Sequence, residues 1–281
     1  MRIALCLSGQ MRAMKHCIDT LEIAFPDCDV DVYATVWNYE DRNNIELLRE
    51  KTNVVYIDTV TDDDLATNIE FEKQVIRRGF YSQYHIKNWA PIPVWNLCRI
   101  ERMAKLSFIP VAHSDCNIHT SGDEYDFVVR SRYDTKYLRN ILPMLDKTKL
   151  LVSEDIGGSA PWDIWKETRM IYDGFAASSY PIMLEYYSFS NWLPSYFEYH
   201  RDTLKAERTL GWFLEEIVAL PMKFDRDFIG LQVNETEWYN RSNPIETNSL
   251  QDKQKETFDF YKSDLKKNHP DLYNEVAFCF E

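Results

Sequence analysis

Two arginines and an aspartate follow a short apolar run in the stretch YDFVVRSRYDT, residues 125–135. Single charges are costly to bury, but arginine offers paired donors to phosphate and aspartate binds divalent cations. Arg130, Arg132 and Asp134 therefore predict a site for a phosphate-bearing ligand, with Asp134 as a candidate ligand for Mg²⁺ or Mn²⁺. The alternative is a surface cluster in which these three charges satisfy one another.

A second candidate site lies near the start of the chain, in IALCLSGQMR, residues 3–12. Its apolar run predicts a buried strand, and Ser8, Gly9 and Gln10 form a polar turn before Arg12. Gly9 would let a ligand approach the backbone, while free N–H groups at the next helix start and Arg12 would attract an anion. Neither a dinucleotide fingerprint nor a P-loop motif is present, so an ordinary strand–helix turn with a surface arginine remains the alternative.

Strand and helix patterns alternate through the first 60 residues. The predicted strands are Arg2–Leu7, Asp29–Trp37 and Asn53–Asp58, and the predicted helices are residues 11–25 and Asn43–Lys51. This order favours a parallel sheet with right-handed crossovers, in which ligands bind at the carboxyl ends of the strands. Both candidate sites fall at such ends.

The remainder of the chain continues the pattern and then becomes helical and aromatic. Further helices are predicted over Asp63–Arg77, Phe80–Leu106, Leu204–Val218 and Gln251–Asn268, and further strands over Tyr125–Arg130, Leu150–Ser153 and Gly174–Ser178. The second of these helices is interrupted near Pro91 and Pro93. No repeat or linker divides the chain, so we expect one α/β domain over residues 1–281.

Charge and hydropathy exclude several classes of protein. The chain has 281 residues, with 32 Lys+Arg against 45 Asp+Glu and a formal net charge of −13. This balance argues against nucleic-acid binding, which needs a cationic face. No run approaches the roughly 18 apolar residues of a membrane span, and the first apolar run is too short for a signal peptide. The six cysteines form no CxxC pair and predict reduced thiols in a cytoplasmic protein.

Several motifs, taken in order, resemble a family of GT-A-type glycosyltransferases from bacterial surface-polysaccharide loci, phages and large DNA viruses of algae. They are ALCLSGQMR, DVYATVW, FYSQYHIKNW and VVRSRYDT, with looser likeness through DGFAASS and ERTLGWFLEE. The resemblance covers about residues 1–180. It implies a GT-A-like fold with a Rossmann-like, mostly parallel sheet flanked by helices. Residues 1–135 would form a nucleotide-sugar-binding half, residues 136–250 a helical and aromatic acceptor-binding half, and residues 251–281 a helical tail.

The resemblance also implies a donor site built from strand ends and the middle helix. Its expected members are Ser8, Gly9, Gln10, Arg12, Thr35, Trp37, Tyr84, Asn88, Arg130, Arg132 and Asp134. Thr35 and Trp37 would flank the base or the ribose. The family commonly uses a divalent metal, Mn²⁺ or Mg²⁺, but Arg132 stands where other GT-A enzymes carry the first aspartate of Asp-x-Asp. An arginine would then replace part of the charge of the metal, and metal dependence stays open.

An inverting glycosyl transfer needs a carboxylate as general base on the acceptor hydroxyl and cations for the leaving diphosphate. Glu207 resembles the carboxylate that inverting GT-A enzymes place at a helix start, although acidic residues are also favoured there by the helix dipole. Asp173 precedes a strand of small residues, and Asp155 lies in a loop that could cover donor and acceptor. These three are the candidate catalytic residues, with Glu207 narrowly preferred.

The sequence thus predicts a cytoplasmic glycosyltransferase, in the host cytoplasm if the chain is viral. It would move a sugar from a nucleotide diphosphate to a glycan hydroxyl, with a UDP-sugar favoured and UDP-xylose one candidate. A non-catalytic carbohydrate-binding protein is an alternative, which would need neither the arginines nor a base. Another is a nucleotidyltransferase, which would need two or more clustered metal carboxylates, whereas only Asp134 stands beside the arginines.

Overall fold

The computed structural model describes part of the chain in detail. The described residues are 1–11, 13–38, 40, 42–61, 93–112, 124–154, 171–189, 191–192, 206–225, 227–232, 238–239 and, near the C-terminus, 263, 266, 267, 270 and 274. The predicted helix Asp63–Arg77 and most of the predicted helix Gln251–Asn268 lie outside these residues. The division of residues 1–281 into halves and a tail stays a prediction.

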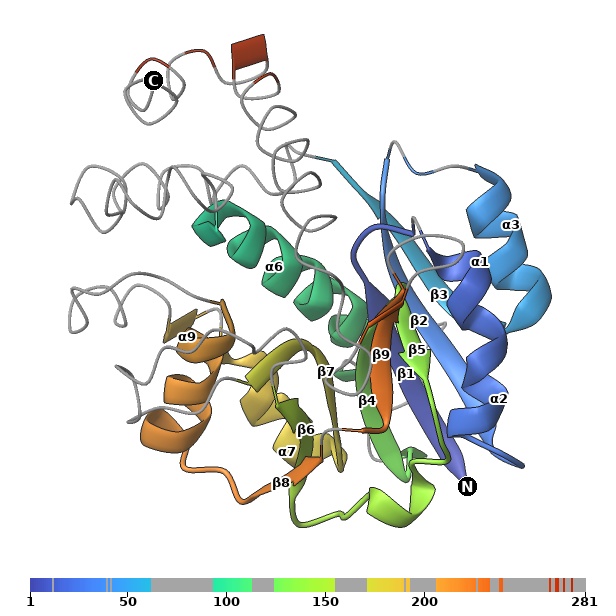
Figure 1. Cartoon of the computed structure of the whole chain (residues 1–281), viewed down its shortest axis with the longest axis vertical. Coiled ribbons are helices and arrows are strands. Elements are labelled where there is room, and N and C mark those ends of the chain that lie inside the picture. The colour runs from blue at the N-terminus through green and yellow to red at the C-terminus, as the bar shows by residue number, and fades with distance from the viewer. Residues whose placement is uncertain are drawn as a thin grey trace.

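A seven-stranded sheet forms the middle of the molecule (Figure 1). In spatial order its strands are β3 (Asn53–Val60), β2 (Asp29–Trp37), β1 (Arg2–Ser8), β4 (Phe127–Arg132), β7 (Ile171–Ser178), β6 (Leu150–Glu154) and β8 (Met222–Asp225). The first four are parallel, β7 is antiparallel to both neighbours, and β6 and β8 are again parallel. The predicted α/β class with a mostly parallel sheet is confirmed, and strands of both halves share this one sheet.

A small antiparallel sheet lies beside the main one, and the sequence did not predict it. It consists of β10 (Trp238–Tyr239), β9 (Ile229–Gln232) and β5 (Thr135–Tyr137). Strands of two to four residues carry too little alternation to be recognised from sequence. Because β5 begins directly after Asp134, pairing with β9 anchors the chain where it leaves β4.

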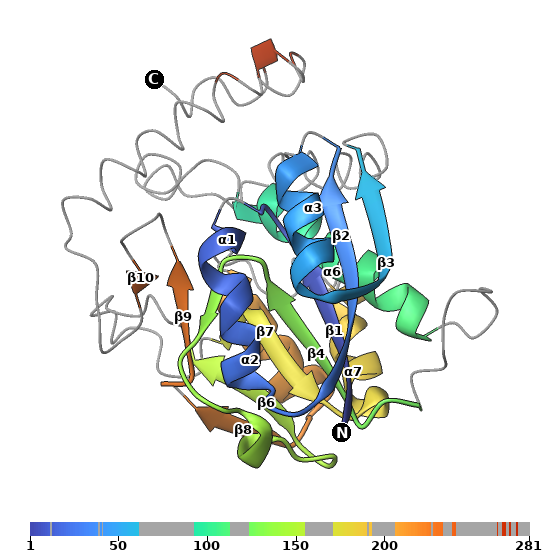
Figure 2. The same cartoon turned by 90° about the vertical axis from the view of Figure 1, so that its right-hand side faces the viewer.

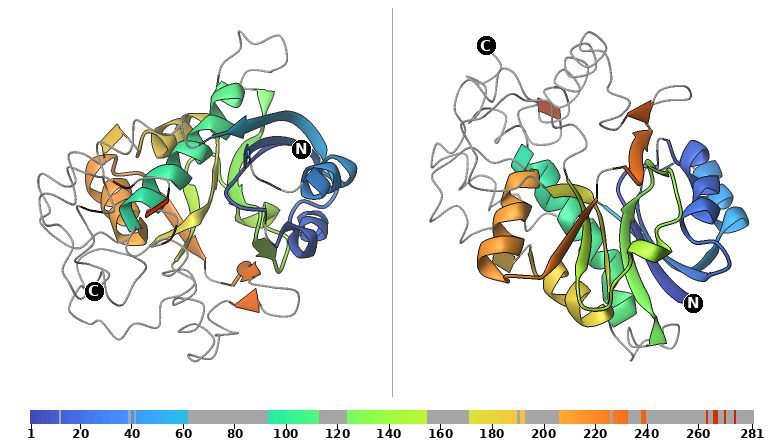
Figure 3. Two further views of the ribbon diagram at one scale, coloured as in Figure 1. Left: turned by 90° about the horizontal axis from the view of Figure 1, so that it is seen from above. Right: turned by 60° about the horizontal axis from the view of Figure 1, so that its bottom comes forward.

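Helices cover both faces of the main sheet (Figure 2 and Figure 3). On one face lie α1 (Met14–Cys17), α2 (Leu21–Ala24) and α3 (Arg42–Lys51), and on the other lie α6 (Pro93–Ala112), α7 (Tyr180–Tyr187) and α9 (Ala206–Trp212). Because side chains alternate along β1, Leu5 and Leu7 pack in the core beneath α1, α2 and α3, whereas Ala4 and Cys6 pack in the core beneath α6, α7 and α9. Within the described residues, no helix is both long and apolar enough to span a membrane.

The single helix predicted over residues 11–25 is wrong in detail. The chain forms α1, then a 3-10 turn at Ile18–Thr20, then α2. The Thr20 hydroxyl donates to the Cys17 carbonyl at 2.6 Å and accepts the Tyr137 N–H at 3.0 Å. Side-chain bonds of this kind compete with the regular helical pattern, which the apolar spacing alone does not reveal.

The later helices agree better with the predictions. Residues 80–92 of the helix predicted over Phe80–Leu106 lie outside the described residues, and the remainder is present in α6, which extends to Ala112. The helix predicted over Leu204–Val218 is present as α9 followed by a π-helical turn, Phe213–Ile217. α7 was predicted only as part of an aromatic, partly helical region.

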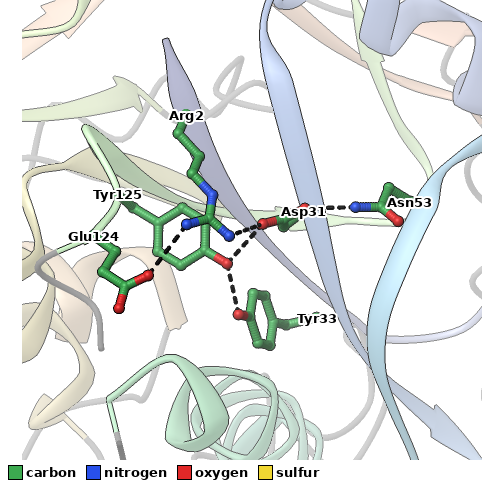
Figure 4. Close-up of polar contacts among 6 residues, drawn as sticks. All are labelled: Arg2, Asp31, Tyr33, Asn53, Glu124 and Tyr125. Carbon is green, nitrogen blue, oxygen red and sulfur yellow. Dashed lines mark hydrogen bonds and ion pairs between the residues drawn. The ribbon is translucent and has the colours of Figure 1, made fainter. Parts of the chain in front are cut away.

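A polar network joins the beginnings of four strands at the amino edge of the sheet (Figure 4). The Asp31 carboxylate accepts hydrogen bonds from Arg2 Nη2 at 2.9 Å, Asn53 Nδ2 at 2.6 Å and the Tyr125 hydroxyl at 2.9 Å. The hydroxyls of Tyr33 and Tyr125 are 2.7 Å apart, and since the Tyr125 proton is directed to Asp31, Tyr33 is the donor. Asp31 is only 7% exposed, so this network links β1, β2, β3 and the segment entering β4 in a poorly solvated place.

We expect Asp31→Asn to lower the free energy of unfolding by about 2 kcal/mol, because hydrogen bonds to a charged group contribute about 1.5–3 kcal/mol. Urea unfolding followed by circular dichroism measures the change. The control is Glu46→Gln on α3. The Glu46 side chain is 58% exposed, so this substitution should lower the free energy of unfolding by less than about 0.5 kcal/mol. Equal effects of the two substitutions would contradict a stabilising role for the network.

Candidate functional site

The predicted residues Ser8, Thr35 and Arg132 form one row near the carboxyl edge of the sheet. Ser8 of β1 pairs in register with Thr35 of β2 on one side and Arg132 of β4 on the other. Ser8 and Thr35 are fully buried, and within the described part of the chain neither hydroxyl oxygen has a hydrogen-bond partner. Buried polar groups without partners are uncommon, and one explanation for such groups is a ligand that supplies the missing bonds.

The turn after β1 has the backbone geometry that glycine permits. Gly9 has a φ of +111°, which side-chain-bearing residues rarely adopt, and open space surrounds the position of its missing Cβ. Gln10 is exposed, and Trp37, at the end of β2, is buried. The turn is therefore shaped as predicted, although its contact with a nucleotide stays a prediction.

The anion site predicted at the start of the next helix is described only in part, because Arg12 lies outside the described residues. α1 begins at Met14, later than the predicted helix, and is continued by the 3-10 turn and α2. The Met11 N–H, which was expected to be free for a ligand, donates to Glu40 Oε2 at 3.1 Å. A carboxylate of the protein thus occupies this donor, so Met11 does not offer its N–H to a phosphate.

Arg132 and Asp134 form a bidentate ion pair in the turn after β4. Arg132 Nε donates to Asp134 Oδ1 and Nη2 to Oδ2, each at 2.8 Å. The Asp134 side chain is 3% exposed and that of Arg132 is 20% exposed. Burial disfavours the charged guanidinium, but the Asp134 carboxylate outweighs it and holds the pKa of Arg132 well above its ordinary value. Asp134 thus holds the guanidinium of Arg132 in a fixed orientation at the edge of the site.

This pairing bears on the metal that the family resemblance implies. Each oxygen of Asp134 accepts a bond from Arg132, so a metal at Asp134 would share the carboxylate with this guanidinium. Across the described ranges, no three His, Cys, Asp or Glu side chains lie close enough to hold an ion together. Metal binding by Asp134 stays a prediction.

Arg130 lies one pleat deeper than Arg132 and is 1% exposed. Its Nη1 donates to the Tyr186 hydroxyl of α7 at 3.1 Å, and its guanidinium carbon lies 6.0 Å from the centre of that ring. In this position the side chain joins β4 to α7 beneath the edge. The expected contact of Arg130 with a diphosphate does not follow from this placement and stays a prediction.

Asp173 lies at the same edge because β7 runs antiparallel to β4, so its first residues meet the carboxyl end of β4. Asp173 is 6% exposed, and its charge helps to raise the pKa of Arg132. The neighbouring Gly174 has no Cβ, and one built there would overlap the ring of Tyr172. The absence of a side chain at Gly174 thus leaves room for the Tyr172 ring. Tyr172, like Asp173, lies close enough to Arg132 to contribute to its raised pKa.

The remaining candidates are placed only in part. Glu207 lies in the first turn of α9, which packs against β7 and α6, but its side chain is outside the described set. Arg12, Tyr84, Asn88 and Asp155 are also outside the described residues. Their expected roles stay predictions.

Sequence reasoning missed two residues at this edge, Glu40 and Tyr133. The Tyr133 hydroxyl reaches the carbonyl oxygens of Thr35 at 3.2 Å and Leu7 at 3.4 Å, where β2 and β1 end. Glu40 follows β2 by three residues, so the rule that ligands bind at strand ends was the available signal. Tyr133 lies within the motif VVRSRYDT, but nothing in the motif indicates its contacts, and no motif marks Glu40.

The fold and this edge define an α/β protein with a candidate ligand site at the carboxyl ends of its strands. No protein-family model matches the chain, and no curated protein matches it. Among solved structures it is similar to mouse xyloside xylosyltransferase 1 in its apo form, with 12% identity and a TM-score of 0.43 over 80% of this chain and 84% of that one. It is also similar to galactosyltransferase LgtC in complex with donor and acceptor sugar analogues, with 14% identity and a TM-score of 0.44 over 80% and 73% of the two chains. Likenesses of this size carry no argument about donor, acceptor or mechanism.

We expect Asp134→Asn to lower the free energy of unfolding by about 2 kcal/mol, because it leaves the largely buried Arg132 without its counter-ion. Asp225→Asn is the control, since its ion pair with Arg139 is more exposed and should contribute less than about 1 kcal/mol. Thermal unfolding with and without Mn²⁺ completes the test. A Mn²⁺-dependent rise in the melting temperature of the wild type that Asp134→Asn abolishes would contradict the ion-pair role and support a metal ligand.

Proposed function

We propose that this chain is a GT-A-type glycosyltransferase that moves a sugar from a nucleoside-diphosphate donor to a hydroxyl of a glycan. The observation that carries the proposal is the row Thr35–Ser8–Arg132, in which two buried hydroxyls and a held guanidinium occupy adjacent strands. Neighbouring strands are about 4.8 Å apart, so the row extends about 10 Å along the edge. A nucleoside diphosphate lying across the edge would reach from the hydroxyls to the guanidinium.

Arg132 supplies the positioned positive charge that stabilises a leaving diphosphate. Negative charge develops on the leaving diphosphate as the bond between the anomeric carbon and the phosphate oxygen breaks and the bond to the acceptor hydroxyl forms, and a cation held in place stabilises this charge without reorganising at that moment. Asp134 orients the guanidinium through two hydrogen bonds and leaves its remaining N–H groups for phosphate oxygens. A flexible lysine at this position would supply the charge without the planar fork.

The general base must lie on the side of the sugar away from the diphosphate in an inverting transfer. The charge of Asp173 lies close enough to Arg132 to help raise the pKa of that arginine. Glu207 lies in the first turn of α9 and is favoured as the base because it resembles the carboxylate that inverting GT-A enzymes place at a helix start. Asp173 would orient Arg132 or the acceptor, and Asp155 is next in line as the base.

A UDP-sugar is the favoured donor, a preference that rests on the family resemblance, and UDP-xylose is one candidate sugar. The similar solved structures are glycosyltransferases by name, which agrees with the proposal but does not carry it. Localisation in the cytoplasm is part of the same proposal.

Nucleotide binding tests the donor site directly. UDP should raise the melting temperature of the wild type more than GDP does, corresponding to roughly 2.7 kcal/mol at a hundredfold excess over Kd. Arg132→Lys keeps a charge beside Asp134 but loses the fork, so its affinity for UDP should fall about tenfold or more. Arg42→Lys on the exposed face of α3 is the matched control. If millimolar nucleotide does not change the melting temperature of the wild type, the donor-site proposal is overturned.

Loss of the base should affect transfer and not binding. Glu207→Gln is expected to bind UDP as the wild type does and to transfer sugar at least about a hundredfold more slowly. Asp173→Asn should mainly raise the acceptor KM, and Glu216→Gln on the exposed side of the following turn should behave as wild type. Steady-state kinetics with donor and acceptor varied separately distinguish these effects. Exchanged phenotypes would exchange the two roles.

A further inference from the structure

Glu40 places a carboxylate at the carboxyl edge that the proposed transfer does not yet use. Its Oε2 accepts the Met11 N–H at 3.1 Å, which joins the segment after β2 to the turn after β1. Glu40 is half-buried, and its own N–H donates to the Trp37 carbonyl at 3.0 Å. The carboxylate of Glu40 is therefore fixed against the turn after β1, and its backbone is fixed against the end of β2.

Tyr133 shows which part of the edge Glu40 occupies. The Tyr133 hydroxyl contacts the carbonyl oxygens of Leu7 and Thr35, which lie near the carboxyl ends of β1 and β2. Burial raises the pKa of Tyr133 well above its ordinary value, and the negative charge of Glu40 adds to this effect. Glu40 thus lies near the ends of β1 and β2, the two strands that carry Ser8 and Thr35, whose hydroxyls have no hydrogen-bond partner among the described residues.

The chemistry of these groups restricts what they can recognise. An ionised carboxylate only accepts hydrogen bonds, whereas serine and threonine hydroxyls both donate and accept. One oxygen of Glu40 accepts the Met11 N–H, and the side chain is partly exposed, so the other oxygen is available to a donor on a ligand. A uracil ring offers a single N–H between two carbonyl oxygens that a carboxylate would repel, but a ribose offers two adjacent hydroxyl donors.

We propose that Glu40 binds the ribose hydroxyls of the donor nucleotide and makes the site selective for ribonucleotides over deoxyribonucleotides. This inference rests on the proposed function and names a specificity-determining residue of the same site. Glu40 repels phosphate, while Arg132 attracts it two strands away. The nucleoside therefore lies over β1 and β2, and the diphosphate points toward β4 and β7.

Binding of UDP, 2′-deoxy-UDP and 3′-deoxy-UDP to the full chain tests the inference by isothermal titration calorimetry. The wild type should bind UDP about tenfold or more tightly than at least one deoxy analogue, the range expected for a hydrogen bond to a charged group. Glu40→Gln keeps an oxygen for the Met11 N–H and replaces the other by an amide donor. It should bind UDP more weakly, bind the deoxy analogues as the wild type does, and so lose most of the preference.

Two further variants separate ribose binding from a structural role. Glu46→Gln on α3 is the matched control and should keep the full preference for UDP. Glu40→Ala removes the contact with Met11 as well, so it distinguishes loss of the turn from loss of the ribose contact. If Glu40→Gln keeps the wild-type preference while Glu40→Ala weakens all three ligands equally, Glu40 only holds the turn and the inference is overturned.

The result also separates this inference from the proposed function. A wild type that binds UDP and both deoxy analogues equally overturns the role of Glu40 and leaves the donor site standing. A wild type that binds no nucleoside diphosphate overturns both. Selective loss of the ribose preference in Glu40→Gln supports both.

Discussion

The buried carboxylate of Asp31 is the interaction on which the arrangement of this sheet depends. Parallel strands have no hairpin turns to set their register, so contacts between distant segments must do so. Asp31 accepts bonds from Arg2 on β1, Asn53 on β3 and Tyr125 before β4, and thereby aligns these strands at the amino edge. Aligned beginnings give aligned ends, which is why Thr35, Ser8 and Arg132 share a row at the opposite edge.

The two edges of the sheet use polar groups in different ways. At the amino edge, Asp31 and the paired tyrosine hydroxyls satisfy one another and stabilise the fold. At the carboxyl edge, the hydroxyls of Ser8 and Thr35 are buried without a partner in the described structure, an arrangement that a bound ligand would complete. This division agrees with the general tendency of open α/β sheets to bind ligands at the carboxyl ends of strands.

Charge varies along the carboxyl edge in a way that would orient a nucleotide. Glu40 lies over the ends of β1 and β2, whereas the guanidinium of Arg132, held by Asp134, lies at the end of β4. In the proposed enzyme the negative diphosphate is directed away from one and toward the other. Both oxygens of Asp134 accept hydrogen bonds from Arg132. In the proposed enzyme, the cation that faces the leaving group is therefore the guanidinium of Arg132.

The sequence by itself determined the class of the fold and most of the strands, because apolar runs and their spacing report local burial. The strand-end rule also located Ser8 and Arg132 at one edge, and the family resemblance added Thr35, whereas Asp173 reaches this edge only because β7 runs antiparallel to β4. Tertiary structure alone decided what these groups contact. Asp134 pairs with Arg132 rather than standing free, Arg130 turns beneath the edge toward Tyr186, and Glu40 takes the N–H expected to bind an anion. These partners come from register and from helices far along the chain, and a local pattern carries no information about non-local pairing.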